Sequence, residues 1–135
     1  MRKPIIKRCE AMGLRMTGQR RTIAQVIEEA EDHPDVEELL RRAVARDAGI
    51  SIATVYRTVK LFEEAGILDK LEFGDGRARY EDAERDHHDH LIDIDTGELI
   101  EIPGREMAEL RARIVSDLGY DIVNQHTILR GRRKP

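Results

Sequence analysis

The stretch over residues 51–82 limits most strongly what this sequence can fold into. Its first part runs from Ser51 to Gly66. Serine is a favoured residue at the start of a helix and glycine just after its end, so this part predicts a helix. Its second part places Gly74-Asp75-Gly76 between two strand-like segments, 68–73 and 77–81, which predicts a β-hairpin. A helix followed at once by a hairpin is typical of a winged helix-turn-helix.

The residues before this stretch predict three more helices, over 5–13, 17–30 and 35–46. Apolar residues recur at helical spacing in the second (Ile23, Val26, Ile27, Ala30) and the third (Val36, Leu39, Leu40, Ala43, Val44). Pro34 separates them, because proline lacks an amide donor and restricts its predecessor. Residues 1–82 are therefore predicted to form a winged-helix domain.

The remainder, 83–135, predicts a small α/β domain after a polar linker over 82–89. Thr96-Gly97 separates strands over 91–94 and 98–102, a helix covers 106–118, and a last strand covers 121–129. The helix places Met107, Leu110, Ile114 and Leu118 on one face. So small a sheet is marginal alone, and we expect it to dimerise with a second copy. The predicted class is α+β.

Charge and composition narrow the range of functions that are expected for this chain. Residues 1–21 carry seven Lys or Arg and one acid, whereas residues 81–135 carry 8 basic and 13 acidic residues. The basic N-terminal segment is suited to binding a polyanion, and the acidic C-terminal segment is suited to binding a cation. The N-terminus lacks the apolar core of a signal peptide, no run is long enough to span a membrane, and Cys9 is the only cysteine. We expect a cytoplasmic protein without a cysteine-bound zinc.

The helix over 51–66 has an outer face suited to the major groove of DNA. Ile52, Val55, Val59 and Phe62 share an inner stripe, and Ala53, Thr54, Tyr56, Arg57 and Lys60 lie opposite. Arg57 is suited to guanine, Thr54 and Tyr56 to thymine methyls, and Lys60 to phosphate. An amphipathic surface helix that touches nothing is the alternative, and the following hairpin argues against it.

Two arginines near the second helix are further candidates for DNA contact. Arg15 lies in a loop, from which it can enter a narrow, A·T-rich minor groove. Arg20 is suited to phosphate, whereas Arg21 is better explained as a solvated side chain.

A dense cluster of potential metal ligands, Asp86-His87-His88-Asp89-His90, follows the first domain. In an extended chain His88 and His90 share one face, and His87 and Asp89 share the other, so the segment is able to serve two sites. His33, Glu81 and Glu101 are candidate partners from elsewhere. Imidazole and carboxylate without thiolate suit Fe²⁺, Mn²⁺, Zn²⁺ or Co²⁺. A metal at the junction of the domains would set the separation of two DNA-reading helices in a dimer.

Several motifs together resemble the ferric uptake regulator family. They cover nearly the whole chain and include segments 13–20, 32–38, 51–59, 78–81 and 87–92. The resemblance implies a homodimeric repressor that binds an A·T-rich inverted repeat when it is loaded with metal. The expected metal is Fe²⁺ or Mn²⁺, and Zn²⁺ is expected to bind in vitro. The resemblance also implies a regulatory site of His33, Glu81, His88 and His90 with Glu101 close by, and DNA contacts from Arg15, Tyr56 and Arg57.

The chain departs from the family pattern at two places. The stretch 93–96 lacks the family's Cys-x-x-Cys, so no structural zinc is expected. The family's second site joins a Glu and a His to the positions of His87 and Asp89, but here Ala108 and Gln125 stand in those positions. Glu109 and His126 are one residue out of place, and Glu106 is a possible substitute. We expect this second site to be weak, lost or rebuilt.

Two other functions remain as alternatives. A non-haem metalloenzyme would need an open coordination position and a substrate pocket, and the sequence offers no evident nucleophile–base pair. A winged-helix regulator of a small organic ligand would leave the histidines incidental. Neither is favoured, so we expect no enzyme activity and no small organic substrate. The sequence does not separate iron, manganese, peroxide and haem as signals.

Overall fold

The computed structural model describes residues 3–72, 74, 76–84, 88–122, 125 and 127–135. The chain divides into two compact units, Met1–Arg85 and Asp86–Pro135, and each is described here by itself. Within the described residues, no helix combines the length and the apolar character needed to cross a membrane.

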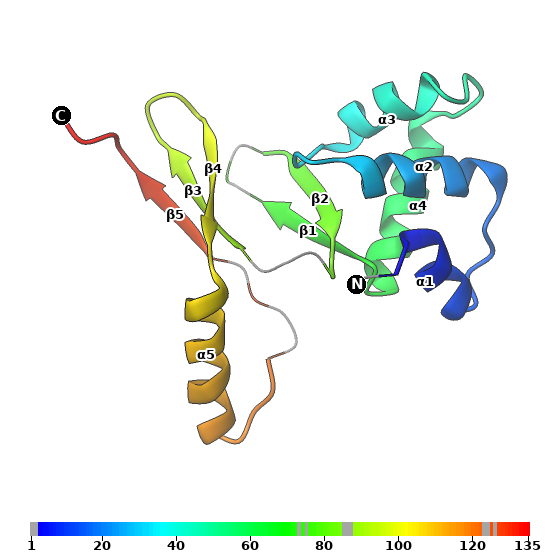
Figure 1. Ribbon diagram of the computed structural model, residues 1–135. Helices are drawn as coiled ribbons and strands as arrows, with labels where there is room; N and C mark the ends of the chain where they lie inside the picture. The colour runs from blue at the N-terminus through cyan, green and yellow to red at the C-terminus, as the bar shows by residue number, and fades with distance from the viewer. Residues whose placement is uncertain (1–2, 73, 75, 85–87, 123–124, 126) are drawn as a thin grey trace. The chain divides into compact units, whose positions relative to one another are not determined.

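The first unit contains four helices followed by a two-stranded hairpin (Figure 1). The helices are α1 (Ile5–Ala11), α2 (Gly18–Glu29), α3 (Val36–Val44) and α4 (Ile52–Glu64). The strands β1 (Leu68–Glu72) and β2 (Ala78–Asp82) pair antiparallel, with Leu68 opposite Asp82. This order is the predicted winged helix-turn-helix, with α4 directly before the wing.

Side-chain caps explain where three of these helices begin. Thr17, Asp35 and Ser51 each accept a hydrogen bond from the backbone amide three residues further on. Such caps satisfy amides that have no partner inside the helix. At the other end of α4, Gly66 has φ of 75°, the left-handed conformation that glycine adopts without strain. These local signals confirm the predicted helix starts.

The core of the first unit lies between its helices and the hairpin. Val55, Val59 and Phe62 of α4 are buried, as the apolar spacing predicts. Ile52 is exposed, contrary to prediction, because it is the first residue of α4 and lies beyond the packed part of the helix. Thr58, between Val55 and Phe62 on the inner face, is buried instead. Val44, predicted to point inward, is also exposed at the last residue of α3.

Cys9 is fully buried in α1 and belongs to this core. Burial raises the pKa of the Cys9 thiol, although the neighbouring charge of Arg8 opposes the shift. A buried thiol with a raised pKa is poorly reactive, because the thiolate is the reactive form. This environment favours a structural role for Cys9 over a redox role.

The second unit is a three-stranded sheet with one helix. Its elements are β3 (His88–Asp93), β4 (Leu99–Pro103), α5 (Arg105–Asp117) and β5 (Ile128–Gly131). β3 is the central strand, antiparallel to β4 and parallel to β5. The two units together confirm the predicted α+β class.

Two strand boundaries in the second unit differ from the prediction. β3 begins at His88 instead of residue 91, because the polar residues 88–90 pair with 101–103 of β4. β5 covers only Ile128–Gly131 instead of 121–129, since it pairs with β3 over four positions, from His90 to Asp93. In both cases the pairing with a neighbouring strand, and not the local polarity of the sequence, sets the length of the strand.

Helix α5 contributes no buried residue to the second unit. Met107, Leu110, Ile114 and Leu118, the predicted apolar face, are all exposed, as are Ile94, Ile100 and Leu129 of the sheet region. A monomer rarely leaves so much apolar surface uncovered. The second unit therefore has the surface that the predicted dimer requires.

Candidate metal centre and nucleic-acid interface

The corner between α2 and α3 lies against the wing strand β2. The amide of Tyr80 donates a hydrogen bond to the carbonyl oxygen of Pro34 at 3.1 Å, and Asp35 forms an antiparallel bridge with Arg79. Continuing this antiparallel register by two residues places His33 opposite Glu81. The corner thus pairs with the hairpin like a short third strand. This pairing positions the backbone of His33 opposite Glu81.

His33 and Glu81 meet in the first unit. Nε2 of His33 lies 3.1 Å from Oε2 of Glu81, and the two side chains are only 6% and 11% exposed. An imidazole nitrogen and a carboxylate oxygen this close, and this well shielded from water, fit as two ligands of one divalent cation. The pair is able to supply part of a metal site, and the remaining ligands must come from other residues.

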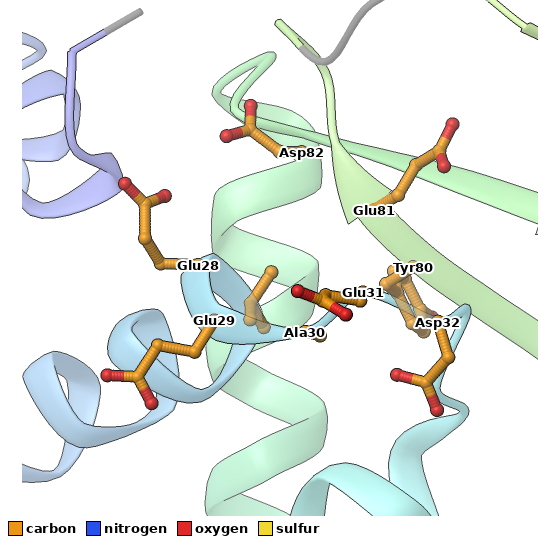
Figure 2. Close-up of a pocket in the computed structure, with 9 residues that line it drawn as sticks. Glu28, Glu29, Ala30, Glu31, Asp32, Tyr80, Glu81 and Asp82 are labelled. Carbon is orange, nitrogen blue, oxygen red and sulfur yellow. The ribbon is translucent and has the colours of Figure 1, made fainter.

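A hollow of about 370 Å³ lies beside this pair, and its lining is strongly acidic. Figure 2 shows the carboxylates of Glu28, Glu29, Glu31, Asp32, Glu81 and Asp82 around it. Salt bridges join Glu29 to Arg46, Asp32 to Arg42 and Asp82 to Arg8. The hydrogen bond from Arg42 lowers the pKa of Asp32 against the opposing effect of burial. A hollow with this charge favours cations and repels phosphate or carboxylate ligands.

Strand β3 carries the second set of predicted ligands. His90 is buried and lies directly opposite Glu101 of β4, so the two side chains start from the same face of the sheet. His88 is the first residue of the same strand, and its side chain lies outside what the structure describes. Glu101 is exposed. His87 lies outside the described residues.

The opposite face of β3 carries Asp89, the other candidate of the predicted second site. Asp89 is buried, and Arg111 of α5 lies beside it. Ala108 and Gln125 are both half-buried, whereas Glu106 and Glu109 are exposed, and Glu109 pairs with Arg105. His126 lies outside the described residues. The described residues around Asp89 do not form a set of metal ligands.

The predicted DNA-reading face of α4 is open to solvent. Tyr56, Arg57 and Lys60 are exposed, and Thr54 is half-buried. The Arg57 guanidinium donates a long hydrogen bond of 3.5 Å to Oγ1 of Thr54, which holds it along the outer face of the helix. The helix therefore presents an aromatic ring and two cations on one surface.

The loop that carries Arg15 is braced by Arg20. Nη1 of Arg20 donates a 2.6 Å hydrogen bond to the carbonyl oxygen of Arg15, while the Arg15 side chain is exposed. Gln19 similarly donates to the carbonyl of Gly49, which ties α2 to the turn before α4. The sequence does not reveal these contacts, because a side chain that donates to a backbone carbonyl leaves no pattern of residue types.

Arg8 is a further residue that sequence reasoning missed. It was counted among the basic residues available to a polyanion, but its guanidinium forms two hydrogen bonds with Asp82, at 2.8 and 2.5 Å. Burial alone would lower the pKa of Arg8, but the hydrogen bonds and charge of Asp82 outweigh it and raise that pKa. This pair ties α1 to the end of the wing, next to Glu81.

Comparisons with known proteins agree with these features. The sequence profile of the "Ferric uptake regulator family" matches residues 11–129. The "Ferric uptake regulation protein" of Rhizobium leguminosarum bv. viciae is 53% identical over 129 residues, which are 96% of this chain and 91% of that protein.

Solved structures show the same similarity. The ferric uptake regulator from Pseudomonas aeruginosa with manganese has a TM-score of 0.87 at 30% identity and matches 98% of this chain and 100% of its own. A zinc-bound manganese uptake regulator has a TM-score of 0.73 at 51% identity, over 98% of this chain and 100% of its own. Similar proteins have thus been solved with different divalent metals.

Proposed function

Because this chain belongs to the ferric uptake regulator family, we propose that it is a repressor in the cytoplasm that binds DNA as a homodimer when it holds a divalent metal. Membership makes it a metal-responsive regulator, and its relatives are named as regulators and not as enzymes. The observation that carries the proposal is the buried His33–Glu81 pair directly behind the wing. The first unit supplies the DNA-reading helix, and the second unit supplies the dimer surface.

The regulatory metal takes ligands from both units. His33 and Glu81 come from the first, and His88, His90 and Glu101 come from the β3–β4 pair in the second, where His90 lies opposite Glu101. In this proposal the metal fixes the angle between the two units. A dimer reads two half-sites only when its recognition helices are about 34–36 Å apart, one turn of DNA. A fixed angle therefore permits DNA binding, and a free angle weakens it.

Fe²⁺ or Mn²⁺ is the proposed signal. The ligands offer nitrogen and oxygen without thiolate, a set that suits these ions, and Zn²⁺ would bind it in vitro because it binds such sites more tightly. One relative with 51% identity is a manganese uptake regulator, and another with 53% identity is named for iron. Either ion would then control genes for metal homeostasis.

The function is tested by titrating DNA binding with metal. The full-length chain is assayed anaerobically on A·T-rich inverted-repeat DNA with Fe²⁺, Mn²⁺, Zn²⁺ or a chelator, at one salt concentration because phosphate contacts make affinity salt-dependent. We expect tight binding with Fe²⁺ or Mn²⁺ and a large loss with chelator. Equal affinity with and without metal would contradict metal gating.

The α4 face gives a sharper prediction about sequence preference. Arg57→Ala should weaken binding to the best site by about 1–3 kcal/mol and relax the preference at one base pair, because a guanidinium–guanine pair is lost. Metal affinity should stay unchanged. The measurement is competition binding on a set of single-base variants of the operator.

Lys60→Ala serves as the contrasting variant. A phosphate contact carries no sequence information, so its loss should weaken all sites equally and lower the salt dependence by about one charge. If Arg57→Ala behaves in this way too, α4 anchors the protein without reading bases.

A further inference from the structure

Asp89 is a buried carboxylate of the second unit that the proposed regulatory site does not use. It lies on the central strand β3, on the face opposite His90. A buried carboxylate is costly unless a cation compensates it. The sequence suggested a second metal as that cation, with His87 as a co-ligand.

An arginine of the same unit supplies a cation at this carboxylate. Nη1 of Arg111 lies 3.7 Å from Oδ1 of Asp89, and the Asp89 side chain is only 8% exposed. The Arg111 side chain as a whole is 30% exposed, but its Nη1 atom is buried. This nitrogen forms no hydrogen bond with the described part of the chain, so the contact with Asp89 is electrostatic.

This arrangement opposes a metal at Asp89. An arginine is always protonated, so a divalent cation bound to the same carboxylate would meet a fixed positive charge a few ångströms away. The side chains at 108 and 125 are a methyl group and a neutral amide, and neither adds the negative charge that would offset the repulsion. The described residues around Asp89 therefore do not fit a second metal.

We infer that Arg111 is a built-in substitute for a second metal ion: its guanidinium compensates Asp89 and positions α5 on the sheet without any bound cation. The position of α5 matters because this helix has no buried residue of its own to hold it. Its exposed apolar face also belongs to the proposed dimer surface. The second unit is then assembled independently of metal, and the chain responds to one ion per protomer.

The first test is the metal stoichiometry of the full-length chain. Zn²⁺, a strongly competing ion for such sites, is titrated into the wild type, Asp89→Asn and Glu81→Gln, without DNA. We expect one equivalent per chain for the wild type and for Asp89→Asn, and loss of that tight equivalent for Glu81→Gln. A second wild-type equivalent that disappears in Asp89→Asn would overturn the inference. This outcome is independent of whether the chain binds DNA.

The second test is thermal unfolding in chelator. Arg111→Met and Asp89→Asn should each lower Tm by about 4–8 °C, the shift that corresponds to losing roughly one ion-pair contribution in a small domain. The double variant should be less destabilised than the sum, because both changes remove one interaction. Arg113→Met, at an exposed position of the same helix, is the control and should leave Tm unchanged. Additive shifts for Arg111 and Asp89 would contradict the pairing.

Discussion

His33→Ala is expected to abolish the metal response of DNA binding. Removing one ligand of a buried site should weaken Mn²⁺ or Fe²⁺ binding by at least about 100-fold, since even the loss of a group that only orients a ligand costs 10–100-fold. At a metal concentration that saturates the wild type, the operator affinity of His33→Ala should then equal the affinity that the wild type has in chelator. Isothermal titration for metal and fluorescence anisotropy for DNA measure the two effects on the same preparation.

The control for this variant is Glu37→Gln. Glu37 is an exposed carboxylate in the first turn of α3, close in sequence to His33 but outside the proposed ligand set. It should keep both the metal affinity and the metal response. Circular dichroism of His33→Ala tests whether the fold survives the change. A folded His33→Ala protein that still gains DNA affinity with metal would remove His33 from the site.

Arg8→Met is expected to destabilise the first unit by about 3 kcal/mol. Arg8 and Asp82 are 10% and 5% exposed, so removing the guanidinium leaves a carboxylate buried without its cation. Breaking a buried pair on one side costs roughly 3–5 kcal/mol, whereas replacing both partners costs much less. Asp82→Asn should have a similar effect, and the double variant should be closer to the wild type than the sum of the two. Urea unfolding followed by circular dichroism gives the values.

Lys7→Met is the matched control for this pair. Lys7 is the exposed neighbour of Arg8 on α1, and its loss should change the free energy of unfolding by less than about 0.5 kcal/mol. If Lys7→Met and Arg8→Met destabilise equally, the contribution of Arg8 is general charge and not its bond with Asp82. Metal titration of the same variants shows whether weakening the end of β2 lowers the metal affinity of the site that contains Glu81.

Local signals were sufficient for most of the first unit. The caps at Thr17, Asp35 and Ser51 and the glycine at 66 set the helix boundaries through bonds within four residues. The exposed face of α4 followed from its periodicity. The errors fell at helix ends such as Ile52, where periodicity continues but the packed neighbours do not.

The extent of β3 and the partners of its ligands were harder to predict. Polar residues 88 and 89 indicated the end of a linker, yet they belong to a strand because β4 offers a pairing edge. The prediction that Glu101 would lie beside His90 is matched by the strand register. The roles of these residues as ligands stay predictions.

The sequence by itself determined the class of the fold, the outward-facing surface of α4 and the types of the candidate ligands, because these depend on periodicity, caps and residue types. Only the tertiary structure decided which distant charges meet. Arg8 pairs with Asp82, His33 lies against Glu81, and Arg111 takes the place beside Asp89. Such pairs depend on strand register and helix packing, which bring together residues whose spacing along the chain carries no signal.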